Sequence, residues 1–119
     1  MKVLIVEDEV QLAEQLSHAL SEAGYATREA VDGQDALDLV IGSLDVPDLV
    51  VTDLGLPRMD GYELARRLRA EHPSLPVLLI SGHVHPDPPP IEGTPWPLLR
   101  KPFPPDELVR RVGELLAAP

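Results

Sequence analysis

Residues 49–61 read Leu-Val-Val-Thr-Asp-Leu-Gly-Leu-Pro-Arg-Met-Asp-Gly, and the fold class follows from this stretch. The aliphatic run Leu49 to Thr52 predicts a strand that is buried on both faces, since it has no polar alternation. Asp53 follows this strand directly. Pro57 to Gly61 predicts a loop, and Tyr62 to Glu71 predicts a helix with one apolar face. A buried strand followed by a loop and a helix is the repeating unit of a parallel α/β fold.

The same unit recurs on both sides of this stretch. Further strands are predicted at Lys2–Val6, Tyr25–Ala30, Val77–Ile80 and Trp96–Leu99, and further helices at Val10–Ala23, at Gln34–Ser43 and from Pro105 onward. Asp32-Gly33 is a turn signal. Alternating strands and helices with right-handed crossovers predict one α/β domain over residues 1–119, with a doubly wound five-stranded parallel sheet. The predicted strand order is the flavodoxin-like 2-1-3-4-5.

The pattern is interrupted between the fourth and fifth strands. Nine of the 14 prolines lie from Pro86 to Pro105, and the run from His85 to Pro90 is incompatible with a regular helix. We expect a stiff Pro-rich loop here in place of a helix, and a polyproline ligand is the less favoured interpretation. Pro97 places the fifth strand at the edge of the sheet, because proline cannot donate to a strand ladder.

Composition narrows the class of protein. The chain has 119 residues with 44% hydrophobic residues, enough for one core, and it has no cysteine for a disulfide or a thiolate metal site. A net charge of −10 argues against direct nucleic-acid binding. No apolar run approaches the roughly 20 residues that span a bilayer, and acids occur too early for a signal peptide. We therefore expect a cytoplasmic protein without membrane contact.

Polar residues gather where the predicted strands end. Glu7-Asp8-Glu9 follows the first strand, Asp53 the third, Ser81-Gly82 the fourth, and Arg100-Lys101-Pro102 the fifth. The carboxyl ends of parallel strands share one edge, which is where sites form in such sheets. Clustered carboxylates repel unless a cation lies among them, and an oxygen-rich set suits Mg²⁺. A carboxylate beside Mg²⁺, an ammonium and a hydroxyl is suited to attack on phosphorus.

Four stretches at these strand ends resemble the signature stretches of response-regulator receiver domains in two-component signalling. They are residues 3–9 (VLIVEDE), 51–61 (VTDLGLPRMDG), 80–82 (ISG) and 101–103 (KPF), and their order and spacing match along nearly the whole chain. The resemblance implies a phosphoprotein that acts in phosphorelay signal transduction. It would be a switch that catalyses its own phosphotransfer and dephosphorylation, not a metabolic enzyme.

The resemblance also implies roles for single residues. Asp53 matches the phosphorylated aspartate, Ser81 the switch hydroxyl, Lys101 the catalytic lysine, and Pro102 a turn of the cis-proline type. The Mg²⁺ ligands implied are Asp8 directly, Glu7 through water, Asp53, and the main-chain carbonyl of Gly55. Gly55 and His83 match positions that adjust how fast water reaches the acyl phosphate.

Two departures from the family pattern concern the response to phosphorylation. Receiver domains generally carry Tyr or Phe three residues before the lysine, whereas Leu98 stands here and Trp96 lies two residues earlier. The Pro-rich segment replaces the fourth helix, which commonly belongs to the signalling and dimer face. The chemistry of phosphorylation is expected to be complete, whereas its readout is expected to be altered.

The expected partner is a sensor histidine kinase or a histidine phosphotransfer protein that docks against the first helix, and homodimer formation is left open. The main alternative is a phosphorylation-independent interaction module with the same fold. An aspartyl hydrolase would need a general acid where Gly55 stands, and a flavin binder would need a phosphate-cradling loop where Glu7-Asp8-Glu9 stands.

Single residues at these strand ends also have simpler interpretations. Taken singly, Glu7 and Asp8 could cap the first helix and Lys101 could be a surface residue. Zinc binding by His83 and His85 lacks further ligands.

Overall fold

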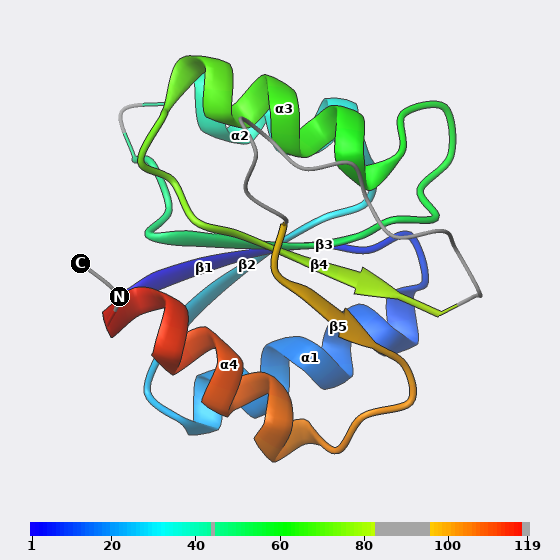
Figure 1. The fold of residues 1–119 in the computed structure, drawn as a ribbon, viewed down its shortest axis with the longest axis vertical. Helices are drawn as coiled ribbons and strands as arrows, with labels where there is room; N and C mark the ends of the chain where they lie inside the picture. Colours follow the sequence, from blue (N-terminus) through cyan, green and yellow to red (C-terminus); the bar gives the residue numbers. More distant parts are fainter. Residues whose placement is uncertain (44, 83–95, 118–119) are drawn as a thin grey trace.

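A single parallel sheet forms the centre of the molecule. The computed structural model describes residues 1–43, 45–82 and 96–117. Its five strands lie in the order β2-β1-β3-β4-β5, and every neighbouring pair is parallel (Figure 1). The strands are β1 (Lys2–Val6), β2 (Ala26–Ala30), β3 (Leu49–Asp53), β4 (Val77–Ser81) and β5 (Leu98–Arg100). The predicted fold class and strand order are confirmed.

Helices cover both faces of this sheet. On one face lie α2 (Gly33–Ile41) and α3 (Gly61–Glu71), and on the other lie α1 (Val10–Glu22) and α4 (Pro105–Ala117) (Figure 1). Each helix end that the sequence predicted lies within two residues of the end in the structure. The Pro-rich segment expected to replace a helix lies at 83–95, outside the described residues.

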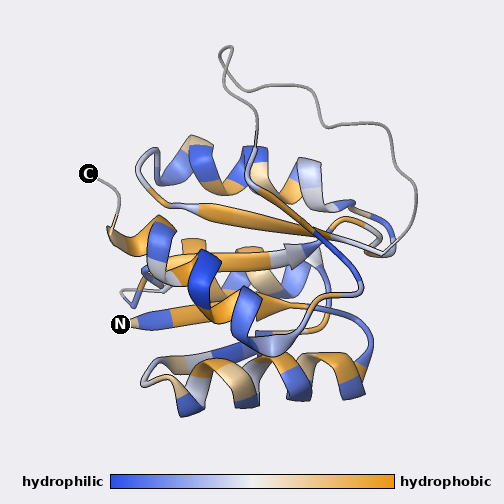
Figure 2. Cartoon of the chain, turned by 60° about the horizontal axis from the view of Figure 1, so that its bottom comes forward, coloured by the Kyte–Doolittle hydropathy of each residue, from blue (hydrophilic) through white to orange (hydrophobic). Residues whose placement is uncertain are grey.

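The core is divided into two halves by the sheet. Along β1, Leu4 and Val6 pack on the side of α2 and α3, whereas Val3 and Ile5 pack on the side of α1 and α4. Successive side chains of a strand point to opposite faces, so a strand between two helical layers must be apolar throughout. Figure 2 shows this pattern, with hydrophobic strands in the middle and the hydrophilic faces of the helices turned outward.

The starts of α2 and α3 are fixed by aspartate caps. The Asp32 carboxylate accepts a hydrogen bond from the backbone N–H of Asp35 at 2.8 Å, and Asp60 accepts one from Glu63 at 2.9 Å. Each satisfies an N–H of the first helical turn that has no partner within the helix. The predicted turn at Asp32-Gly33 and the end of the predicted loop Pro57 to Gly61 are therefore the beginnings of these two helices.

The fifth strand is displaced from its predicted position. It runs from Leu98 to Arg100 rather than from Trp96 to Leu99, and it is the edge strand, as Pro97 predicted. Pro97 has no N–H, but its carbonyl oxygen accepts a hydrogen bond from the N–H of Leu79 at 3.0 Å. Trp96 lies before the strand, buried at 6% exposure in the core half of α2 and α3. The Arg69 guanidinium lies 4.8 Å from the centroid of its ring.

Candidate functional site

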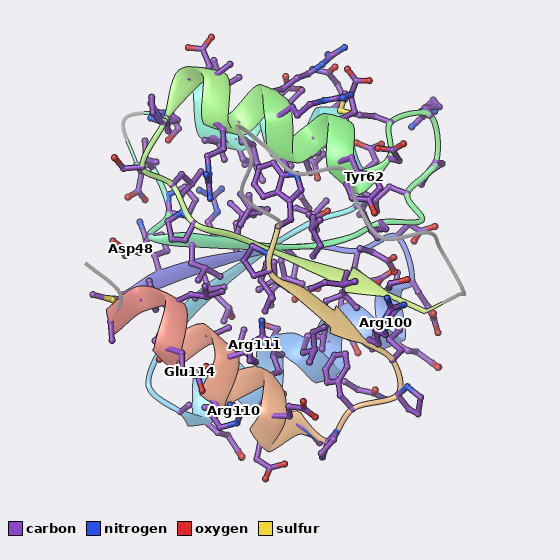
Figure 3. The ribbon with its side chains drawn as sticks, in the orientation of Figure 1. Asp48, Tyr62, Arg100, Arg110, Arg111 and Glu114 are labelled. Atoms are coloured by element: carbon purple, nitrogen blue, oxygen red, sulfur yellow. The ribbon has the colours of Figure 1, made fainter. Side chains whose placement is uncertain are left out.

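The carboxyl ends of the strands bring Glu7, Asp53 and Lys101 together. Asp53 is the last residue of β3, Glu7 follows β1 directly, and Lys101 follows β5 directly. Figure 3 labels Arg100 at this end of the sheet and Asp48, just before β3, at the opposite end. Buried strands on both sides of Asp53 thus hold its side chain at the edge where the topology predicted a site.

Both carboxylate oxygens of Asp53 have partners. Its Oδ2 accepts a hydrogen bond from Lys101 Nζ at 2.8 Å, and its Oδ1 accepts one from the backbone N–H of Gly55 at 2.9 Å. Lys101 Nζ also lies 3.5 Å from Oε1 of Glu7. One ammonium group therefore bridges two carboxyl groups that stand 46 residues apart in the sequence.

The protonation of the three groups is linked. Burial, followed by a hydrogen bond to Asp53, raises the pKa of Glu7 to about 8. Burial acts to raise the pKa of Asp53 as well, but hydrogen bonds from Glu7, Lys101 and the Gly55 N–H lower it. Burial opposes the charge on Lys101, yet its hydrogen bond and attraction to Asp53 raise its pKa. Around neutral pH, Glu7 thus holds a proton while Asp53 stays ionised beside a charged Lys101.

The donor set suits a hard cation. Burial and the neighbouring Asp53 raise the pKa of Glu7, so its ionised form is disfavoured unless a further positive charge lies beside it. Among the residues described, no three His, Cys, Asp or Glu side chains converge closely enough to hold a metal by themselves. Mg²⁺ does not require such a cage, because it keeps several waters and takes only one or two carboxylates. Within residues 1–43, 45–82 and 96–117, the carboxylates at this edge therefore fit Mg²⁺ rather than zinc.

The other predicted site residues lie around this cluster. Asp8 is exposed beside Glu7, with which it interacts, and Ser81 is buried at the end of β4. The bond between Lys101 and Pro102 is cis, as the family resemblance implied. Leu98 is half-buried and packs against the core half of α2 and α3, away from the polar cluster. His83 lies outside the described residues.

Two simpler interpretations from the sequence are wrong. Glu9, rather than Glu7 or Asp8, occupies the N-cap position of α1, and its side chain makes no capping hydrogen bond. Glu7 instead accepts a hydrogen bond from the N–H of Glu9 at 3.1 Å. Lys101 is no freely solvated surface residue, since its ammonium group contacts two carboxyl groups.

Gly61 belongs to the site through its backbone, although the sequence suggested only a turn there. A Cβ added at this position would lie 2.6 Å from the carbonyl oxygen of Asp53 and 2.9 Å from Cα of Leu54. These are backbone atoms that cannot easily move, so only glycine allows α3 to begin this close to the end of β3. The signal in the sequence is a glycine directly after a capping aspartate, within eight residues of Asp53.

The protein-family model of the response regulator receiver domain matches residues 3–113. The chain belongs to the response-regulator receiver family. The receiver domain of NtrX from Brucella abortus is 32% identical, with a TM-score of 0.84 over 98% of this chain and 99% of that one. The receiver domain of the hybrid histidine kinase CckA is 30% identical, with a TM-score of 0.80 over 98% of this chain and 99% of that one.

Similar receiver domains also occur within longer proteins. Response regulator MprA of Mycolicibacterium vanbaalenii is 40% identical over 82 residues, which are 69% of this chain and 35% of that protein. The corresponding protein of Mycobacterium avium is 39% identical over the same length. The chain thus spans about a third of the length of these curated relatives. In the part of the receiver domain that the structure describes, no helix has the length and hydrophobicity to cross a membrane.

Proposed function

We propose that this receiver domain, residues 1–119, accepts a phosphoryl group on Asp53 and serves as a switch or relay element of a two-component system. The observation that supports this most directly is the contact of 2.8 Å between the Asp53 carboxylate and Lys101 Nζ, at the carboxyl edge of a parallel sheet. A nucleophile must keep its lone pairs available, and the lowered pKa of Asp53 does that. A neighbouring ammonium group stabilises the negative charge on the transferring group.

In the proposed reaction, an oxygen of Asp53 bonds to the phosphorus of a phosphohistidine while the P–N bond breaks and the imidazole leaves. The Gly55 N–H holds Oδ1 of Asp53, and Lys101 lies beside Oδ2, so the carboxylate is oriented before the donor arrives. Mg²⁺, when bound by Asp8, Asp53, the Gly55 carbonyl and, through water, Glu7, supplies positive charge for the phosphoryl oxygens. The buried Ser81 hydroxyl would bond one of these oxygens, and water later hydrolyses the acyl phosphate.

A hollow beside the site supports the choice of partner. It has a volume of about 280 Å³ and lies between α1 and the segment that follows β5. Its lining is mainly apolar and includes Leu12, Leu16, Ala19, Pro102 and Phe103, together with Lys101. We infer that a helix of a histidine kinase or a histidine phosphotransfer protein docks here, because an apolar face next to Lys101 would bring a phosphohistidine to Asp53.

The readout of this phosphorylation is proposed to differ from the family pattern. Leu98 packs into apolar surroundings where receiver domains generally carry Tyr or Phe, and it has no polar group with which to respond to Ser81. That His83 influences the lifetime of the acyl phosphate also remains a proposal. An unchanged lifetime in His83→Ala would contradict it.

The test is the intact mass of the protein after incubation with acetyl phosphate, with and without Mg²⁺. We expect a labile gain of one phosphoryl group that requires Mg²⁺ and is absent in Asp53→Asn, which keeps the size of the side chain. Absence of any gain in the wild type, together with no binding of Mg²⁺, would contradict the proposal. The phosphorylation-independent interaction module would then be the better explanation.

A further inference from the structure

The loop between β3 and α3, residues 54–60, carries Gly55 next to the proposed phosphoacceptor. Its two ends are fixed by the backbone: the N–H of Gly55 bonds to Asp53 Oδ1, and the N–H of Gly61 bonds to the carbonyl oxygen of Leu54 at 3.1 Å. Between these ends Leu56 is buried in the core, whereas Pro57 and Arg58 are exposed. Pro57, Arg58 and Met59 line a hollow together with the start of α2.

Arg58 links the loop to the start of α2. Its Nη2 lies 2.8 Å from Oδ2 of Asp32, while the other oxygen of Asp32 caps α2. Asp35 closes the turn by accepting a hydrogen bond from the N–H of Val31 at 3.0 Å. The Asp32 side chain is only 18% exposed, whereas that of Arg58 is 79% exposed. Arg58 thus extends from the loop to a half-buried carboxylate that caps α2.

The backbone of Arg58 needs such a contact. Its φ is 67°, and among the residues with described coordinates it is the one non-glycine residue with a positive φ. This left-handed conformation is unfavourable for an arginine and persists only where surrounding contacts hold it. Close packing of the next residue is a second such contact, since a Cβ on Gly33 would lie 2.8 Å from Sδ of Met59.

We propose that Arg58 is a positioning residue for the proposed Mg²⁺ and phosphoacceptor site. Its ion pair with Asp32 holds the loop in the shape that keeps Gly55 against Asp53, so the N-cap residue of α2 shapes the site without touching it. This inference rests on the proposed function, because the effect on Mg²⁺ binding requires that the Gly55 carbonyl binds the cation. Exposed ion pairs add little to stability, so the free energy of unfolding should change little, and Mg²⁺ binding is the readout that distinguishes a positioning role from a purely structural one.

The experiment is a titration of the unphosphorylated full chain with MgCl₂ by calorimetry, with urea unfolding run in parallel. The variants are Arg58→Ala, Arg58→Lys, Asp32→Asn and the double variant Arg58→Ala with Asp32→Asn. Asparagine is as good an N-cap as aspartate, so Asp32→Asn removes the ion pair and leaves the helix start intact. Arg66→Ala is the control, since Arg66 is an exposed arginine of α3 whose ion pair with Glu63 does not involve the loop.

We expect Arg58→Ala and Asp32→Asn each to weaken Mg²⁺ binding by about two- to fivefold, which is the range of one exposed ion pair. The double variant should be no weaker than Arg58→Ala, and Arg58→Lys should recover part of the affinity. In Arg58→Ala the loss of a positive charge alone would strengthen the binding of a cation, so a weaker affinity in this variant cannot come from charge. Asp32→Asn removes a negative charge, so its loss of affinity counts only together with that of Arg58→Ala and with the double variant. Arg66→Ala should leave the affinity unchanged or slightly stronger.

Unchanged affinity in Arg58→Ala would overturn the inference, and so would losses that simply add in the double variant. A loss that Arg66→Ala shares would overturn it as well. In each case a wild type that binds Mg²⁺ and is phosphorylated leaves the proposed function standing. A wild type that binds no Mg²⁺ would instead overturn the proposed function, and this inference with it.

Discussion

The end of β3 and the start of β5 differ in how their side chains are held. At the end of β3, Asp53 has a hydrogen-bond partner on each carboxylate oxygen, and its charged neighbour comes from another strand. At the start of β5, Leu98 and Trp96 are held by apolar packing in one half of the core. The first region keeps the residue pattern of the receiver family, whereas the second departs from it.

This difference separates the proposed chemistry from its readout. The proposed phosphorylation uses groups at the carboxyl ends of the strands, together with Gly55 in the loop after β3 and with Mg²⁺. The readout in receiver domains generally uses a ring at the position of Leu98. Here the single aromatic residue near that position is Trp96, which is buried and contacts Arg69. The two regions should therefore respond differently to mutation.

Removal of Lys101 should have the largest effect. Lys101→Ala takes away the ammonium group that bridges Asp53 and Glu7. We expect phosphorylation by acetyl phosphate at saturating Mg²⁺ to slow by about 10²- to 10³-fold, the usual cost of one charge-stabilising group. Rates from intact-mass time courses would measure this.

Lys2→Ala is the matched control for that prediction. Lys2 pairs with Asp45 at the opposite end of the sheet, so its loss should leave the rate unchanged. Equal rates for Lys101→Ala and the wild type would show that the bridging contact has no catalytic role.

The pKa of Glu7 predicts how Mg²⁺ affinity depends on pH. Because the pKa is raised from 4.5 to about 8, the metal-free folded state holds a proton that the unfolded chain releases above pH 4.5. Metal-free stability should therefore fall as pH rises from 4.5 towards 8. Mg²⁺ favours the ionised carboxylate, so its affinity should rise over the same range, by at most about tenfold per pH unit.

Calorimetric titrations at several pH values would measure this dependence, and Glu7→Gln serves as the control because it cannot titrate. A wild-type affinity that stays flat with pH, or a pH dependence that persists in Glu7→Gln, would show that another group carries the proton.

Gly61→Ala should perturb the proposed site through the backbone. The added methyl group would lie 2.6 Å from the Asp53 carbonyl oxygen, so α3 or the end of β3 must move. We expect a loss of about 1–3 kcal/mol in the free energy of unfolding, measured in urea, and slower phosphorylation of Asp53.

The same substitution at Gly113 tests whether that loss is specific. A Cβ there would lie 3.6 Å from Oη of Tyr25, an ordinary contact, so Gly113→Ala in α4 should stabilise the protein by about 0.5–1 kcal/mol. If Gly61→Ala were as stable and as active as the wild type, Gly61 would have no role in positioning Asp53.

The smallest effect on phosphorylation and stability is expected for Arg69, which contacts Trp96 next to the start of β5. Its guanidinium contacts Trp96, and its Nε donates a hydrogen bond to the carbonyl oxygen of Leu75 at 2.7 Å. Arg69→Ala should reduce the free energy of unfolding by about 1–2 kcal/mol without changing the rate of phosphorylation. Arg66→Ala, one helical turn away and exposed, should change stability by less than about 0.5 kcal/mol. A slower rate in Arg69→Ala would show that the two regions are coupled.

Much of this architecture could be predicted from the sequence, because buried strands leave an unambiguous pattern. The run Leu49 to Thr52 has no polar alternation, and the strand that it predicts is in the centre of the sheet. The topology then requires Glu7, Asp53 and Lys101 to meet at one edge, and they do. The starts of α2 and α3 were harder to predict, because an aspartate before a glycine indicates a turn and a helix cap equally.

What the sequence could not show depends on contacts between distant segments. Gly61 gains its importance from a carbonyl oxygen on β3, and Arg58 from a carboxylate on α2. Neither partner lies at a spacing that a helical or strand period would reveal. The start of β5 was predicted two residues early, since Trp96 and Pro97 look like strand residues until the pairing of Leu79 with Leu98 sets the register.

The most direct test of the central claim is to locate the phosphoryl group chemically. Borohydride reduction of an aspartyl phosphate converts that residue to homoserine, which peptide mass spectrometry identifies by position. We predict homoserine at position 53, formed only after incubation with a phosphodonor and Mg²⁺. Homoserine at Asp8 or at another carboxylate, or no homoserine in a protein that has gained a phosphoryl group, would contradict the assignment of Asp53 as the phosphoacceptor.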